Sequence, residues 1–148
     1  MNRQVYDRIR EAEGEYHAAS LAVARLLIEA GKGQADMREK GLSHADIRRC
    51  QCNLEATYIV RVFAQFEATL RTFWRPPGKH AALPRTYIKH LMDKTATRTR
   101  MPHEVLQQAQ QVRDCRNGLV HEEATGSQMT LAQCRSHLCR FLSHLPQR

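Results

Sequence analysis

The chain has 148 residues, of which 42% are hydrophobic and 26% charged, so we predict one compact domain over residues 1–148 and exclude a disordered or fibrous protein. The best candidate for a membrane span, residues 21–24, is interrupted by Arg25 and falls far short of the ~18 residues required. Residues 1–7 lack the apolar segment of a signal peptide, and we therefore expect a cytoplasmic protein with no membrane partner. The five cysteines include no C-x-x-C pair and are expected to be free thiols.

The net charge of +8 is unevenly distributed along the chain. Residues 1–42 carry seven basic and seven acidic side chains, whereas residues 43–148 carry sixteen basic and eight acidic ones. Between residues 71 and 100 one acidic side chain, Asp93, accompanies eight basic ones: Arg71, Arg75, Lys79, Arg85, Lys89, Lys94, Arg98 and Arg100. Such a concentrated positive field suits a polyanion, and nucleic acid is the first expectation, although basic surfaces also bind acidic proteins.

The first predicted element is a long helix within residues 1–42. Apolar or small residues recur at steps of three and four from Val5 to Ala30, which places them on one face of a helix. Gly31 and Gly33 then end the pattern.

A second and more apolar helix is expected after Ser43. Ser43 and Asp46 have the spacing of a capping box, and apolar positions continue from Ile47 to Phe73. The sequence Pro-Pro-Gly at 76–78 ends this helix, because proline cannot donate a backbone hydrogen bond and restricts the residue before it. The length of the segment predicts the central buried helix of the fold.

Two shorter helices are expected next. One begins near Pro84 and gives way to a loop rich in threonine and arginine, and its buried positions are Ile88, Leu91 and Met92. The other opens at Pro102 and weakens at Gly118. Its apolar stripe contains one charged residue, and the members of the stripe are Val105, Ala109, Val112 and Arg116.

The last predicted helix follows a second capping box, formed by Thr130 and Gln133, and ends before Pro146. Its apolar positions are Leu131, Cys134, Leu138, Phe141 and Leu145. We find no segment with the alternation of a strand, and no internal repeat. The fold class is therefore predicted to be all-α, with four or five helices in a bundle.

The spacing of the histidines and cysteines does not match that of known metal-binding motifs. Neither His103 nor His121 is followed by the second histidine of a zinc-protease helix. Cys134, His137 and Cys139 lie close in sequence, but the two cysteines point to different sides of a helix, so buried thiols are favoured. We expect no metal and no cofactor.

The segment that begins at Arg116 carries the strongest chemical signal. Arginine keeps its charge at physiological pH, and His121, five residues later, is of the residue type that titrates near neutrality. On an unbroken helix the two side chains would lie about 140° apart, so their cooperation within one chain requires a turn, which Gly118 would permit. The alternative is that Arg116 caps carbonyls at the helix end while His121 packs in a loop.

Residues 116–121, Arg-Asn-Gly-Leu-Val-His, resemble the signature of the HEPN superfamily, which consists of small all-α domains found in many prokaryotic toxin and defence ribonucleases. That signature is an arginine, usually followed by a polar residue, and a histidine after four to six residues. An earlier helix ending in residues 66–71 and a final amphipathic helix strengthen the resemblance, which covers roughly residues 45–145. It implies a HEPN-like bundle in residues 43–148, with residues 1–42 as an accessory helix.

The resemblance implies metal-independent endonucleolytic cleavage of RNA at a site formed where two copies of the domain meet. His121 would transfer a proton and Arg116 would hold the phosphate while a 2′-hydroxyl attacks its own phosphodiester. Asn117 would orient either group or cap the helix. Glu67 and Arg71, one turn apart, are given a supporting role, with a helix-surface ion pair as the alternative.

The leading hypothesis is therefore a homodimeric ribonuclease, acting as a toxin or abortive-infection effector and restrained by an antitoxin or other regulatory protein encoded nearby. Its expected RNA-binding residues are Arg75, Lys79, Arg85 and Lys89. Glu123 stands where related toxins controlled by adenylylation carry a tyrosine, so that mode of control is not expected. The alternatives are a noncatalytic HEPN module that binds RNA, a nucleotide or a partner protein, and a basic scaffold that docks on an acidic protein.

Overall fold

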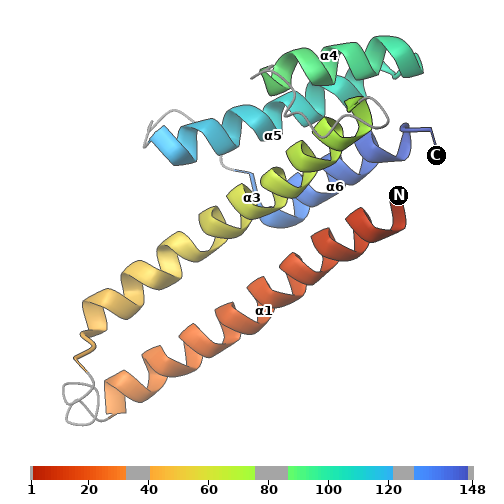
Figure 1. Ribbon diagram of the computed structural model, residues 1–148. Coiled ribbons are helices and arrows are strands. Elements are labelled where there is room, and N and C mark those ends of the chain that lie inside the picture. Colours follow the sequence, from red (N-terminus) through yellow and green to blue (C-terminus); the bar gives the residue numbers. More distant parts are fainter. Residues whose placement is uncertain (1, 33–40, 76–86, 122–128, 147–148) are drawn as a thin grey trace.

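A computed structural model describes residues 2–32, 41–75, 87–121 and 129–146 of the chain. These residues form five α-helices and no strand, which confirms the all-α prediction (Figure 1). The helices are α1 (Asn2–Lys32), α3 (His44–Trp74), α4 (Ile88–Thr99), α5 (His103–His121) and α6 (Leu131–Ser143).

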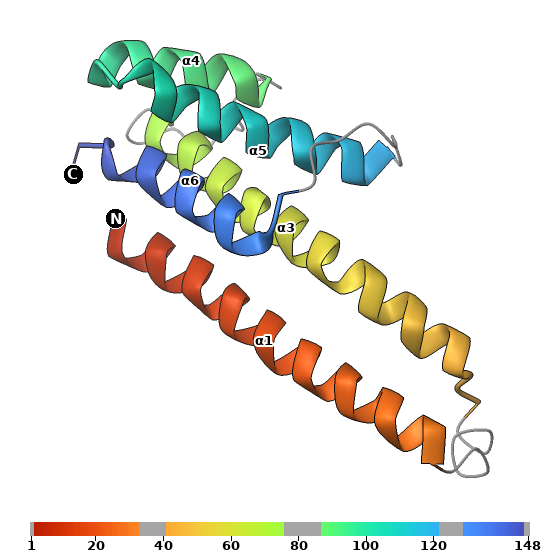
Figure 2. The ribbon, with the colours of Figure 1, turned by 180° about the vertical axis from the view of Figure 1, so that it is seen from behind.

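The long helices α1 and α3 lie antiparallel along their whole length (Figures 1 and 2). Ile9 and Ala12 in the first half of α1 and Val23 and Ala30 in the second are buried, as the three-and-four spacing predicts. An ion pair between Glu15 and the α3 residue Arg61 adds a polar link beside this face. The predicted N-terminal helix is thus confirmed, and its apolar face is covered by α3.

The predicted capping box at the start of α3 is also confirmed. Asp46 N donates to Ser43 Oγ at 3.1 Å, and Ser43 N donates to Asp46 Oδ2 at 3.2 Å. These two bonds satisfy backbone donors that the first turn of a helix leaves without partners. The helix ends at Trp74, and the backbone of Arg75 is extended, which agrees with the predicted end before Pro76. Residues 76–78 lie outside the described ranges.

Helix α4 corrects one prediction, because the expected Thr/Arg-rich loop is helical as far as Thr99. The hydroxyls of Thr95, Thr97 and Thr99 each donate to the backbone carbonyl four residues earlier, at 2.6 to 3.0 Å. Each hydroxyl therefore finds an acceptor inside the helix, and Thr95 is also buried in the contact with α3. The chain then leaves the helix through Arg100, whose φ of 50° is left-handed. The predicted start at Pro84 lies outside the described residues.

Helix α5 corrects a second prediction, because it continues without a turn from His103 to His121. Gly118 is helical and buried. A glycine inside a helix costs up to about 1 kcal/mol relative to alanine, and the packing of α5 offsets that cost.

Helix α6 follows the expected capping box, in which Gln133 N donates to Thr130 Oγ1 at 3.2 Å.

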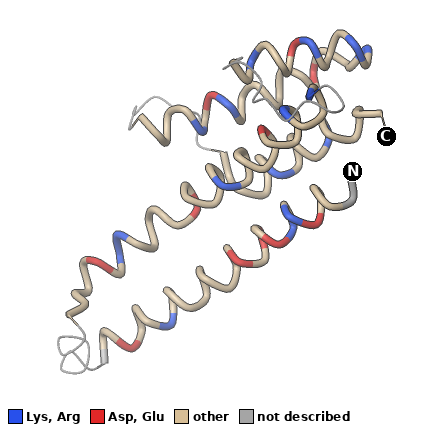
Figure 3. Tube along the Cα trace, viewed as in Figure 1, with Lys and Arg blue, Asp and Glu red and all other residues tan. Residues whose placement is uncertain are grey.

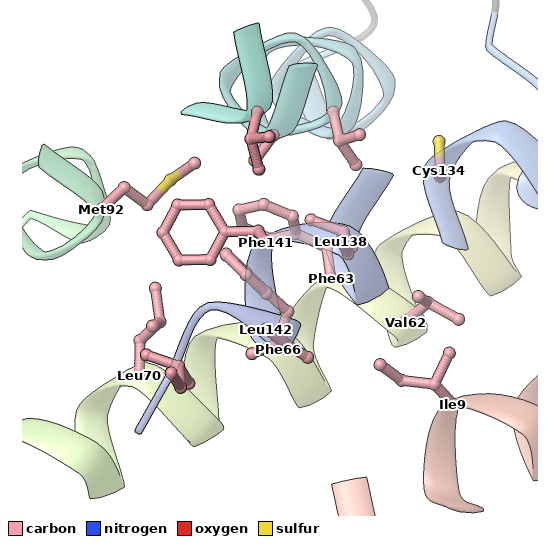
Figure 4. Close-up of a cluster of buried hydrophobic side chains, with 14 of the residues drawn as sticks. Ile9, Val62, Phe63, Phe66, Leu70, Met92, Cys134, Leu138, Phe141 and Leu142 are labelled. Carbon is pink, nitrogen blue, oxygen red and sulfur yellow. The ribbon is translucent and has the colours of Figure 1, made fainter. Parts of the chain in front are cut away.

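The main core lies where the C-terminal half of α3 meets the other four helices (Figure 4). Phe63 and Phe66 of α3 have ring centroids 5.7 Å apart, and Phe141 of α6 packs edge-on against Phe66 at 5.2 Å. A separate small cluster of Val23, Ala30 and Ile47 joins the other ends of α1 and α3. The two long helices therefore project beyond the bundle as an arm with its own apolar contacts, and α5 lies on the far side of α3 from α1 (Figure 1).

Candidate functional site

Arg116 lies on α5 and reaches across to α3. Its guanidinium carbon Cζ is 5.8 Å from the centroid of the Phe63 ring, in cation–π geometry, and the residue is half-buried. Its Nη1 donates to Asn117 Oδ1 at 3.0 Å. Within the described ranges its buried Nε has no hydrogen-bond partner. The arginine thus holds a fixed position with donor capacity to spare, and none of its described bonds goes to a helix carbonyl, as the capping alternative required.

His121 is the last residue of α5 and is exposed. Because the helix is unbroken, His121 lies about 7.5 Å farther along the axis than Arg116 and about 140° around it. The turn that would bring the two side chains together in one chain is absent, and so is the loop in which His121 was expected to pack. Each copy of the chain therefore presents the arginine and the histidine in different directions.

Asn117 lies between these two residues around the helix axis. It is half-buried, and its amide oxygen accepts the bond from Arg116. Its position on α5 is about 40° from that of His121, one helical turn later. Of its two proposed roles, orienting a neighbour agrees with this bond, because the amide holds one edge of the guanidinium.

The end of α5 carries two exposed apolar residues that sequence reasoning did not single out. Leu119 is 40% exposed and Val120 47%. Both continue the stripe of Val112 and Arg116, which farther back on α5 faces the core. The stripe itself was visible in the sequence, but its exposure here depends on where the neighbouring helices end.

Glu67 and Arg71 form the ion pair expected from their spacing. Glu67 Oε1 accepts from Arg71 Nε at 2.9 Å and from Arg71 Nη2 at 2.6 Å, and both side chains are partly buried. Glu67 follows Phe63 by one turn of α3. The pair therefore lies near the ring on which Arg116 rests, and its supporting role in catalysis stays a prediction.

A hydrogen bond joins α3 to α6, and two thiols pack between α5 and α6. Glu55 Oε1, in the middle of α3, accepts from the backbone N of Leu131 at 2.8 Å, at the start of α6. Cys115 and Cys134 meet between α5 and α6, where burial, and then the neighbouring Cys115 and Glu55, raise the pKa of Cys134 to about 12. All five cysteines are free thiols, as predicted, and Cys115 and Cys134 are buried packing residues.

The predicted RNA-binding residues are only partly described. Arg75 and Lys89 are exposed. Lys79 and Arg85 lie outside the described residues, as does Glu123. Figure 3 shows further basic positions along α4. Two of these, Lys94 and Arg98, lie over the Trp74 ring, a contact between helices that sequence spacing does not reveal.

Two features are absent from the part of the chain that the structure describes. No group of three or more histidine, cysteine, aspartate or glutamate side chains there is placed to hold a metal ion. None of its helices combines the length and apolar character that a membrane crossing requires.

Comparison of the chain with known protein families, with curated proteins and with solved structures found no match.

Proposed function

We propose that this chain is a HEPN-type endoribonuclease that cleaves RNA without a metal ion, by attack of a 2′-hydroxyl on the adjacent phosphodiester. The observation that supports this most is the arrangement at the end of α5. A half-buried Arg116 rests on Phe63 with Asn117 bonded to it, and an exposed His121 closes the same helix. The resemblance of residues 116–121 to the HEPN signature supplies the reaction.

The proposed chemistry divides between the two residues. Arg116 supplies fixed positive charge for the phosphorane, because a guanidinium held by a ring and an amide needs little reorganisation as charge develops. His121 transfers the proton, since an exposed imidazole at a helix end is accessible to substrate. One histidine cannot serve both as base for the 2′-hydroxyl and as acid for the departing 5′-oxygen in one step. A second copy supplies the other.

A symmetric homodimer would bring two such helix ends together. Leu119 and Val120 are exposed beside the motif and give an apolar contact for the same surface of another copy. Across a two-fold axis, Arg116 of one chain can approach His121 of the other, which the 140° separation prevents within one chain. Glu67, which forms the ion pair with Arg71, follows Phe63 by one turn of α3, and we give this pair a supporting role.

The decisive experiment compares two exposed histidines at opposite ends of α5. Purified protein is incubated with total RNA, with and without EDTA, and the product ends are mapped. We expect cleavage in EDTA that leaves 2′,3′-cyclic phosphates. His121→Ala should abolish cleavage and His103→Ala should preserve it, because His103 lies at the opposite end of the helix. Equal cleavage by the parent and the His121 variant would contradict the proposal.

In its biological role we propose a cytoplasmic toxin or abortive-infection effector, restrained by an antitoxin or regulatory protein encoded nearby. The second candidate is a noncatalytic HEPN module that binds RNA, a nucleotide or a partner protein. The divergence of Arg116 and His121 within one chain favours this alternative if the chain is a monomer. Light scattering at tens of micromolar that shows a monomer would favour this second candidate, since the ribonuclease requires a dimer.

A further inference from the structure

Besides Arg116 over Phe63, further cation–π contacts lie between α3 and α4, away from the C-terminal end of α5. Lys94 Nζ is 4.2 Å from the centroid of the Trp74 ring, and Arg98 Cζ is 5.2 Å from it. Lys94 and Arg98 are one helical turn apart, so both cations converge on one indole. We call this surface the Trp74 ridge; the side chains that line its shallow depression are Trp74, His90, Asp93, Lys94, Thr97 and Arg98.

The indole of the ridge is held rigidly from behind. Trp74 Nε1 donates to Thr95 Oγ1 at 2.9 Å, and this buried hydroxyl donates in turn to the carbonyl of Leu91 at 2.6 Å. The ring of Phe73 meets Trp74 edge-on, with centroids 5.5 Å apart. The ring is therefore a fixed aromatic platform, and its position does not depend on the cations above it.

The cations of the ridge retain unneutralised positive charge. Among the described residues, neither Lys94 nor Arg98 forms an ion pair with a carboxylate. Asp93, which lines the same depression, accepts a hydrogen bond from Gln110 Nε2 of α5 at 2.8 Å through Oδ1, and the two cations outnumber this one carboxylate. Like charges one turn apart repel each other. An anion bound between Lys94 and Arg98 would relieve that repulsion.

We propose that the Trp74 ridge binds single-stranded RNA, with a phosphate held between Lys94 and Arg98 and a base stacked on the Arg98 guanidinium above the indole. A flat guanidinium backed by an aromatic ring offers a stacking surface that an acidic peptide would not use. A duplex would not use it either, because its bases are already stacked. The chemistry of the ridge therefore selects a ligand with both a phosphate and an unstacked base.

The ridge lies apart from the motif, so it would position a substrate rather than react with it. Gln110, which bonds to Asp93, precedes His121 by eleven residues, or roughly 16 Å along α5. As a substrate-binding surface the ridge rests on the proposed ribonuclease function. As a binding site for single-stranded RNA it is measurable without any cleavage.

The test uses the fluorescence of Trp74, because it is the one tryptophan of the chain. A 2′-O-methyl oligonucleotide, which cannot be cleaved by 2′-hydroxyl attack, is titrated into the protein. Matched titrations use a duplex of the same length, polyphosphate and polyglutamate. We expect saturable quenching by the single strand and at least about tenfold weaker effects from the other three.

Paired variants locate the binding. Lys94→Ala with Arg98→Ala should weaken binding of the single strand about tenfold or more and lower the salt slope of log K by about 0.7, because the contact with one phosphate is lost. Arg25→Ala with Arg48→Ala removes the same charge from exposed positions on α1 and α3 and should change the affinity less than about twofold. Circular dichroism of each variant checks that the helices are intact.

Three results would overturn the ridge. These are quenching as strong with polyglutamate or polyphosphate, oligonucleotide binding by anisotropy with no change in Trp74 emission, and equal losses in the two double variants. The failure of the ribonuclease proposal is distinguishable. If the oligonucleotide binds the ridge but RNA is not cut, the binding proposal is supported and the ribonuclease proposal is contradicted. If RNA is cut while the ridge binds nothing, the ribonuclease proposal is supported and the binding proposal is contradicted.

Discussion

Glu55 and Leu131, 76 residues apart in sequence, are joined by a hydrogen bond of 2.8 Å from the Leu131 backbone N to the Glu55 carboxylate. The bond ties the middle of α3 to the first residue of α6. It also places a negative charge at a helix N-terminus, where the helix dipole favours it. The contact therefore fixes where α6 begins relative to the central helix.

Removing that carboxylate should destabilise the bundle. Glu55→Ala leaves a helix N–H without its partner in a half-buried position, and we expect a loss of about 1.5 kcal/mol in the free energy of unfolding. Glu55→Gln keeps the acceptor but loses the charge, for about 0.5 kcal/mol. Urea denaturation measures both. Glu29→Ala, at an exposed position on α1, is the control and should be near neutral. Equal losses from the Ala and Gln variants would show that the hydrogen bond is not the reason.

The guanidinium of Arg116 should contribute to catalysis, and the aliphatic part of its side chain should contribute to the stability of the fold. Arg116→Met keeps an apolar chain over Phe63 and removes the guanidinium. We expect the free energy of unfolding to change by less than about 1 kcal/mol, while RNA cleavage falls about 100-fold or more. Denaturation and cleavage are measured on the same preparation. Full activity of the Met variant would exclude Arg116 as the phosphate-binding group.

The exposed apolar pair at the end of α5 should control assembly. Replacing Leu119 and Val120 by glutamate places charge in the proposed contact between two copies, and we expect the proposed dimer to dissociate. The fold should survive, because neither side chain is buried. Light scattering gives the mass and circular dichroism the helix content. The same double change at Leu21 and Ile28, exposed on α1, should leave the dimer intact; dissociation by that control would place the contact on the arm.

The two capping boxes should differ in the region that they stabilise. Thr130→Ala and Ser43→Ala each remove a side-chain acceptor from a helix start, for about 1 kcal/mol. Thr130 caps a helix of the main core, so its loss should lower global stability. Ser43 begins the arm, whose apolar cluster is separate, and its loss should speed amide exchange there first. Hydrogen exchange resolved by residue distinguishes these outcomes; uniform changes in both variants would mean that the arm and bundle unfold as one unit.

Local signals in the sequence were enough to predict most of the helices. The spacing of apolar residues along α1 and α3 is a property of consecutive residues, and each capping box is formed within four of them. The all-α class, both boxes, the ion pair of Glu67 with Arg71 and the free cysteines follow from such short-range information. The two errors, at residues 95–99 and at Gly118, arose where local propensity favoured a break.

Those two positions and the partners of the charged side chains depend on how the helices pack against one another. Gly118 stays helical because it is buried in the packed α5, and the end of α4 stays helical because Thr95 is buried and accepts a hydrogen bond from Trp74 Nε1 of α3. That an arginine and a histidine share one segment can be seen in the sequence alone. That Arg116 rests on Phe63, and that Lys94 and Arg98 meet Trp74, depends on how separate helices pack, because such contacts join residues far apart in the chain.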